Sequence, residues 1–150
     1  MKLKTNNLYV RDYMESDLYN LFFCMSKEEV CRYLSFKPYK SIEEAKKELN
    51  IRLKESKYYA ITLLNKKYIG EIYLSKEDDA YELRFLLDDL YWKNGYATEA
   101  IVAVTNYFIE NKGAYKFIAY VNKNNIAACN VLERVGFLKV KETNDIVYEL

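Results

Sequence analysis

Three β-rich runs in the middle of the chain constrain its fold more than any other feature. They extend from Tyr58 to Leu63, from Lys67 to Leu74 and from Tyr81 to Leu87, and the connections between them carry the polar stretches NKK and SKEDD. Runs of this length, rich in β-branched and aromatic residues and separated by short polar connections, are typical of hairpins. The sequence therefore predicts three consecutive antiparallel strands, a meander, within one sheet.

The segments on both sides of the meander predict helices and further strands. In chain order we expect a strand at Leu8 and Val10, a helix after Ser16-Asp17, a short helix from Glu28 to Tyr33, a helix from the capping box Ser41–Glu44 to about Glu55, the meander, a helix from Ala97 to Lys112, a strand in YKFIAYV, a helix in NNIAACNVLERVG and a hairpin in FLKVKETNDIVYEL. This order predicts an α/β (α+β) fold. On the helix that follows Ser41, the basic residues Lys46, Lys47, Arg52 and Lys54 predict a solvated face.

Composition limits the partners that the chain is expected to have. A chain of 150 residues, 51% of them hydrophobic, has the size of one compact domain, and we expect a single domain over residues 1–150. Its 23 lysine and arginine residues balance 22 aspartate and glutamate residues, so the net charge of +1 gives no argument for nucleic acid or an anionic membrane. The sequence has no apolar run that predicts export or a membrane span, and we expect a cytoplasmic protein.

The chain contains no histidine, which excludes several kinds of active site together. Catalysis by Ser-His-Asp or Cys-His groups, metal ligation by imidazole and acid–base chemistry of imidazole all need this residue. The cysteines Cys24, Cys31 and Cys129 are odd in number, lie in apolar sequence and form no C-x-x-C pair, so we expect reduced core thiols and no metal site.

A single glycine, Gly95 in YWKNGYATEA, lies where a strand is expected to turn into a helix. Such a turn points successive backbone N–H groups outward, and the helix dipole adds partial positive charge at the same place. A phosphate could then bind to the amides of residues 93–98, with Gly95 permitting a positive φ or a close backbone approach. The alternative is a plain turn before a helix N-cap.

Two longer stretches resemble a known family. LRFLLDDLYWKNGYATEA and NKNNIAACNVLERVGF resemble the GNAT superfamily of N-acetyltransferases, in particular its RimJ/RimL-like branch, and the resemblance extends over nearly the whole chain. It implies a GNAT-like fold: a mixed, mostly antiparallel central sheet, splayed between its fourth strand, which ends at Leu87, and its fifth, in YKFIAYV, and flanked by helices.

The resemblance also implies where acetyl-CoA binds. The family's phosphate-binding turn corresponds to Trp92–Ala97, and the splayed strand edge would take the pantetheine arm much as a sheet edge takes a peptide. The family's Asn, which touches the coenzyme or orders a water, corresponds to Asn125; the alternative role of Asn125 is to cap the last helix. The expected acetyl-CoA-binding residues are Phe85, Leu86, Leu87, Lys93, Asn94, Gly95, Tyr96, Ala97, Thr98 and Asn125.

The residues for proton transfer are less clear in this chain. Positions where relatives have a tyrosine or a serine hold Leu132 and Ala128, and the position of a glutamate base in some relatives holds Tyr120, although a phenol is a weak base at neutral pH. The remaining candidates are Glu71 and Glu82, acting through water; alternatively, Glu71 pairs with Arg84 across a hairpin. The oxyanion could bind a backbone N–H near Leu86 and Leu87. Tyr33, Tyr39, Tyr58 and Tyr59 are candidates to line an acceptor pocket.

We therefore expect an acetyl-CoA-dependent N-acetyltransferase that acts on a primary amine, either a protein N-terminus or a small amine, by direct attack in a ternary complex. The resemblance leaves a homodimer open. The alternative is a non-catalytic acyl-CoA-binding module, which Ala128, Leu132 and Tyr120 favour. A dinucleotide-binding domain is disfavoured because no G-x-G-x-x-G follows an early strand.

Overall fold

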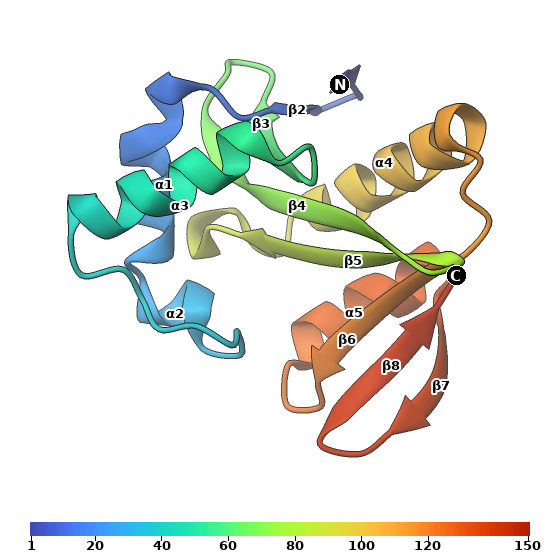
Figure 1. Ribbon diagram of the computed structural model, residues 1–150. Coiled ribbons are helices and arrows are strands. Elements are labelled where there is room, and N and C mark those ends of the chain that lie inside the picture. Colours follow the sequence, from blue (N-terminus) through green and yellow to red (C-terminus); the bar gives the residue numbers. More distant parts are fainter.

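The computed structural model describes residues 1–150 and contains one eight-stranded sheet in the order β1-β2-β3-β4-β5-β6-β8-β7 (Figure 1). The strands are β1 (Lys2–Lys4), β2 (Leu8–Asp12), β3 (Tyr58–Leu63), β4 (Tyr68–Glu77), β5 (Ala80–Leu87), β6 (Phe117–Asn122), β7 (Leu138–Glu142) and β8 (Asp145–Glu149). Every neighbouring pair is antiparallel except β5 and β6. The predicted meander is confirmed as β3-β4-β5, and the short edge strand β1 is an addition to the expected order.

Helices cover both faces of the sheet, as the amphipathic patterns predict. They are α1 (Leu18–Met25), α2 (Glu28–Cys31), α3 (Ile42–Lys54), α4 (Tyr96–Lys112) and α5 (Ile126–Val135), with 3-10 turns at η1 (Glu15–Asp17) and η2 (Asp89–Tyr91). Helices α4 and α5 bury their apolar faces in a core of 22 residues, and α1 and α3 close a second core of ten residues on the other face. None of the helices has both the length and the apolar character to span a bilayer.

Strands β5 and β6 separate soon after they meet. Only Tyr81 pairs with Phe117 and Glu82 with Ile118; beyond these pairs the strands diverge (Figure 1). Strand β5 continues to pair with β4 as far as Leu87, so one of its edges is left open. This is the splay that the resemblance implies, and the mixed, mostly antiparallel sheet with flanking helices is confirmed with it.

The register of the β4–β5 hairpin corrects one prediction. Glu71 lies opposite Leu86 and not opposite Arg84, whose partner is Tyr73. The cause is the turn: Glu77 pairs with Ala80 around a two-residue turn in which Asp78 has φ +52°, one residue later in the chain than expected. The predicted Glu71–Arg84 ion pair is therefore wrong, because moving a turn by one residue changes every cross-strand partner.

Candidate active site

The turn before α4 has the backbone conformation of an anion site. Gly95, the N-cap of α4, has φ +77°, and Lys93 has φ +64°. The N–H groups of Lys93, Asn94 and Gly95 donate to no acceptor in the protein, and the first bond into the helix is donated by the Glu99 N–H to the Gly95 carbonyl at 3.1 Å. The first-turn amides of residues 96–98 also lack intrahelical partners. Successive free N–H groups at a helix N-terminus suit a phosphate.

Side chains hold this turn in place. The Asn94 side-chain amide donates to the carbonyls of Tyr91 and Trp92 at 3.2 and 3.0 Å. The Trp92 indole N–H donates to the Leu87 carbonyl at 2.9 Å, which ties the turn to the end of β5. Trp92 thus has a structural role in this turn.

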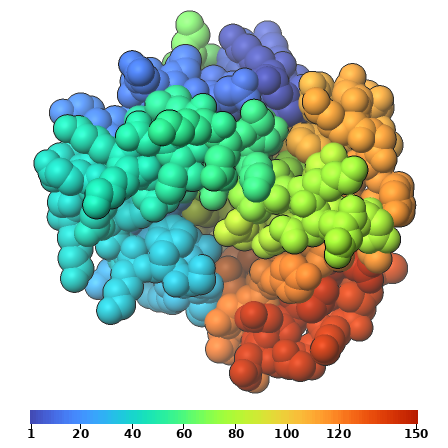
Figure 2. Space-filling view, in the orientation of Figure 1, coloured from blue at the N-terminus to red at the C-terminus, as the bar shows by residue number.

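A cleft of about 720 Å³ extends from this turn along the end of β5. Its lining comes from Phe85, Leu86 and Leu87 of β5, from Gly95 to Thr98 at the start of α4, from α5 and its N-cap Asn125, and from the α2 segment, by which we mean α2 and the residues after it as far as Leu34. Figure 2 shows this α2 segment in light blue beside the orange part of the chain. We call this space the first cleft.

The residues present fit a phosphate-bearing ligand. The charged lining residues of the first cleft are Lys93, Arg134, Arg32 and Glu29, three cations against one anion. Thr98 also lines the cleft, and its hydroxyl oxygen is buried and has no hydrogen-bond partner. An unsatisfied buried hydroxyl costs stability unless a ligand or water completes it, so the cleft offers donors that coenzyme A phosphates and amides can use.

A second, smaller cleft of about 440 Å³ meets the first one at the splay. The two share Tyr33, Leu34, Phe85, Asn125 and Ala128 as lining residues. The second cleft also contains Glu82 and Tyr120, two of the candidate catalytic residues. These two side chains project from the same face of the sheet, because Glu82 pairs with Ile118, two residues before Tyr120.

The open edge of β5 presents alternate backbone groups to the splay. The Tyr81 N–H donates towards β6, to the Lys116 carbonyl at 2.9 Å, and the Asp88 N–H donates in the opposite direction, to Ile69 at 2.7 Å. Since strand residues alternate, the N–H groups of Leu83, Phe85 and Leu87 point to the open edge. The N–H of Leu86, one of the two expected oxyanion donors, points to β4 instead.

Asn125 forms the N-cap of α5, as its alternative role predicted. Its side-chain oxygen accepts a hydrogen bond from the Ala128 N–H at 3.2 Å. Its amide nitrogen donates to no group in the protein, and the residue lines both clefts. Leu132, at the usual tyrosine position, is fully buried and lines neither cleft.

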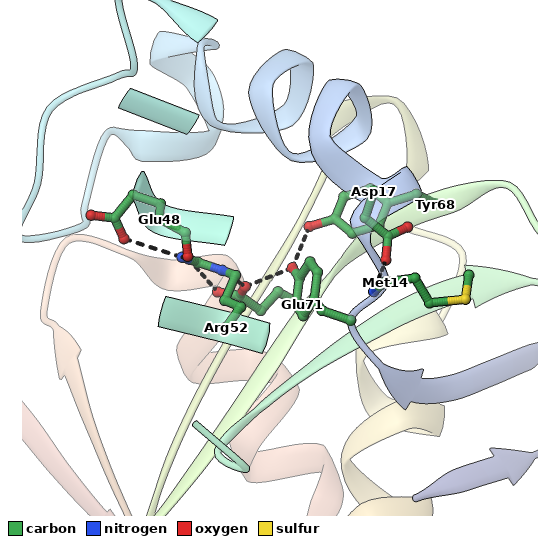
Figure 3. Close-up of polar contacts among 7 residues, drawn as sticks. Met14, Asp17, Glu48, Arg52, Tyr68 and Glu71 are labelled. Atoms are coloured by element: carbon green, nitrogen blue, oxygen red, sulfur yellow. Dashed lines mark hydrogen bonds and ion pairs between the residues drawn. The ribbon is translucent and has the colours of Figure 1, made fainter. Parts of the chain in front are cut away.

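Glu71 lies away from both clefts, in a buried polar cluster under α3 (Figure 3). Arg52 donates to both of its carboxylate oxygens, and the Tyr13 hydroxyl donates to one of them at 2.6 Å. Burial lowers the pKa of the Arg52 guanidinium, but the charge of Glu71 and its hydrogen bond, with smaller contributions from Tyr13 and Tyr39, together outweigh burial and hold that pKa above its usual value. Arg52 is thus buried rather than solvated, and Glu71 lines neither of the two clefts.

Other expected residues divide in the same way. Tyr33 lines both clefts, whereas Tyr39, Tyr58 and Tyr59 line neither. Phe36 and Asp145, which sequence reasoning missed, line the second cleft. Neither residue belongs to a periodic pattern or a motif from which its position could have been predicted.

The three cysteines are buried and unpaired, and no group of three or more Cys, Asp or Glu side chains is arranged to hold a metal ion.

Comparison with known proteins agrees with this geometry. The "Uncharacterized N-acetyltransferase YoaA" of Bacillus subtilis (strain 168) is 27% identical in sequence, over 98% of this chain and 88% of that protein. An acetyltransferase of the GNAT family from Bacillus anthracis superposes with a TM-score of 0.91 at 20% identity, over 100% of this chain and 98% of that one. RimL, a ribosomal L7/L12 alpha-N-protein acetyltransferase solved in complex with coenzyme A, superposes with a TM-score of 0.87 at 17% identity, covering 100% and 97% of the two chains.

The family itself follows from the sequence match. Residues 7–138, most of the chain, match the family model described as an acetyltransferase (GNAT) domain. The chain therefore belongs to the GNAT family of acetyltransferases, and it is an acyltransferase that uses acetyl-CoA as its cosubstrate.

Proposed function

We propose that the protein acetylates a primary amine, a peptide N-terminus or a small amine, by direct attack in a ternary complex. The observation that carries this proposal is that two clefts of different composition meet at the splay between β5 and β6. Acetyl-CoA occupies the first cleft and the amine occupies the second, so that no covalent enzyme intermediate is needed. A buried Cys129 without a basic neighbour gives no alternative nucleophile.

The first cleft holds the coenzyme through the expected residues. The amides of Lys93, Asn94 and Gly95 and of the first turn, Tyr96, Ala97 and Thr98, bind the pyrophosphate, helped by the Lys93 ammonium. The open-edge groups of one of the two residues Phe85 and Leu87 bind a pantetheine amide, which leaves the N–H of the other for the reacting carbonyl, and the Leu86 side chain lines the cleft. Asn125 contributes its free side-chain N–H.

Attack of the amine on the thioester carbonyl of acetyl-CoA forms the N–C bond and a tetrahedral oxyanion, and collapse of that oxyanion breaks the C–S bond and releases the coenzyme thiolate. The backbone N–H of Phe85 or Leu87 stabilises the oxyanion at the open edge of β5. An ammonium acceptor loses two protons, one before it attacks and one as the amide forms. Glu82 accepts each in turn through water that Tyr120 orders, and passes it on to solvent. The coenzyme thiolate takes up one proton from solvent, since a thiolate leaves with little acid assistance.

The test measures acetyl-CoA-dependent release of free thiol against N-terminal peptides and small amines, together with calorimetric binding of acetyl-CoA. We expect release that depends on the acceptor. Replacing Glu82 by Gln should lower kcat by about 10²-fold or more and leave the acetyl-CoA Kd unchanged. Glu77→Gln, at the exposed end of β4 outside both clefts, is the matched control. A variant Glu82→Gln with wild-type kcat and an unchanged pH profile would contradict the proton route.

The non-catalytic module remains the second candidate because Leu132 is buried where many relatives have tyrosine. It predicts the same acetyl-CoA binding without thiol release from any amine. Tyr120→Phe adds a discriminating measurement: if the hydroxyl orders the water, the pH–rate profile shifts while acetyl-CoA binding stays the same.

A further inference from the structure

The charges of the molecule are divided between its two clefts, although the chain as a whole is nearly neutral. The first cleft has three cations against one anion, whereas the charged residues of the second are Glu82, Asp145 and Arg84, two anions against one cation. No lysine lines the second cleft. Although the net charge of the chain is only +1, the first cleft, assigned to the coenzyme, has an excess of cations, and the second cleft, assigned to the amine acceptor, has an excess of anions.

Arg84, the cationic residue that lines the second cleft, already interacts with two neighbouring side chains. The Arg84 guanidinium lies over the Tyr73 ring, 3.7 Å from its centroid, and its Nε is 3.3 Å from a Glu82 oxygen. Asp145 has no ion-pair partner and is exposed at the start of β8. The carboxylate of Asp145 is therefore not neutralised by a cation of the protein, and it can pair with one cationic nitrogen of a ligand.

Aromatic rings form much of the remaining wall. Tyr33, Phe36 and Tyr120 are 38%, 39% and 54% exposed, and all three line this cleft together with Phe85. Large rings that stay exposed beside a carboxylate are suited to an organic cation, because the ring faces attract positive charge while they cover apolar surface.

We infer that the acceptor is a hydrophobic primary amine with a single cationic nitrogen on an apolar or aromatic body, and not a polyamine or an acidic peptide. The inference rests on the proposed function, since it assigns the second cleft to the acceptor. Asp145 and the Glu82–Arg84 pair receive the cation, and the rings of Tyr33, Phe36 and Tyr120 pack against the body. A polyamine would bring several charges to one free carboxylate.

Two measurements test the inference separately from catalysis. Benzyltrimethylammonium, which cannot be acetylated, should bind to the protein saturated with coenzyme A, as measured by calorimetry. In the thiol-release assay, 2-phenylethylamine should have a kcat/KM at least about tenfold higher than glycinamide, spermidine or a peptide that begins with Asp. Phe36→Leu and Asp145→Asn should each weaken benzyltrimethylammonium binding about fivefold.

Matched controls lie outside both clefts. Tyr115→Leu changes a ring that is 70% exposed on another surface, and Glu142→Gln removes a carboxylate from the hairpin that carries Asp145; neither should alter binding of the probe. Absence of probe binding while coenzyme A binds, or a preference for spermidine, would overturn the inference and leave acetyl transfer intact. Probe binding without thiol release from any amine would support the assigned cleft chemistry and overturn the proposed function instead.

Discussion

At the scale of single residues, two glycines of α4 share a left-handed backbone conformation. Comparing the same substitution at both positions distinguishes an effect on folding stability from an effect on acetyl-CoA binding. Gly95 and Gly113 cap the two ends of α4 with φ +77° and +66°, and a Cβ at either position would meet no atom within 4 Å. Gly95→Ala and Gly113→Ala should each lower the free energy of unfolding by about 1 kcal/mol. Only Gly95→Ala should weaken acetyl-CoA binding, because only Gly95 lies in the turn that we propose to bind the pyrophosphate. Denaturation and calorimetry on both variants check this, and equal affinities would contradict the assigned turn.

Sequence reasoning at this scale recognised residues whose neighbours in the chain decide their role, such as Gly95 and Asn125. It failed for Arg52, whose predicted solvated position became a buried ion pair, because its partner Glu71 is 19 residues away on another element. Helical periodicity predicts which face of a helix a residue occupies, but it does not predict whether a carboxylate on another element lies close enough to form an ion pair. For the same reason, the sequence did not predict that Asp145 and Phe36 line the second cleft.

At the scale of elements, Glu99 ties helix α4 to the turn between β1 and β2. Its carboxylate accepts hydrogen bonds from the Thr5 hydroxyl and from the backbone and side-chain N–H groups of Asn7, the latter two at 2.8 and 2.9 Å. Burial raises the pKa of Glu99, but these hydrogen bonds outweigh it and hold the pKa below its usual value of 4.5. The contact therefore contributes stability above the unfolded-state pKa and loses it as the pH falls through the lower folded-state pKa.

The expected result is a fall in the denaturation midpoint on acidification below about pH 4.5, part of which disappears in Glu99→Gln. The control is Glu110→Gln, on the same helix, where the carboxylate is exposed and has no partner. A wild-type acid profile in Glu99→Gln would show that this contact contributes nothing to the pH dependence. Local patterns predicted α4 itself, yet its tether to Thr5 and Asn7 joins residues more than 90 positions apart and has no signature in the sequence.

At the scale of the whole molecule, the sheet consists of two parts joined by two residue pairs. β1 to β5 form one part and β6 to β8 the other, and only Tyr81–Phe117 and Glu82–Ile118 connect them. The order of these elements followed from periodicity and turn residues, and the splay from the family resemblance. The family resemblance also supplied much of the β5, α4 and α5 lining of the first cleft, but not the contribution of the α2 region or the lining of the second cleft by Phe36 and Asp145, which come together only after the chain has folded.

The larger core bridges the two parts of the sheet and should make them unfold together. It contains Ile72 and Leu83 from one part and Phe117 and Tyr148 from the other, and Phe137, 2% exposed, lies within it. Phe137→Ala should lower the free energy of unfolding by about 3–5 kcal/mol, while the transitions followed by Trp92 fluorescence and by far-UV circular dichroism stay coincident. Two separate transitions would mean that β6–β8 fold as an independent unit. In that case the cleft opening would be set by domain motion, and the fixed splay assumed for acetyl transfer would not hold.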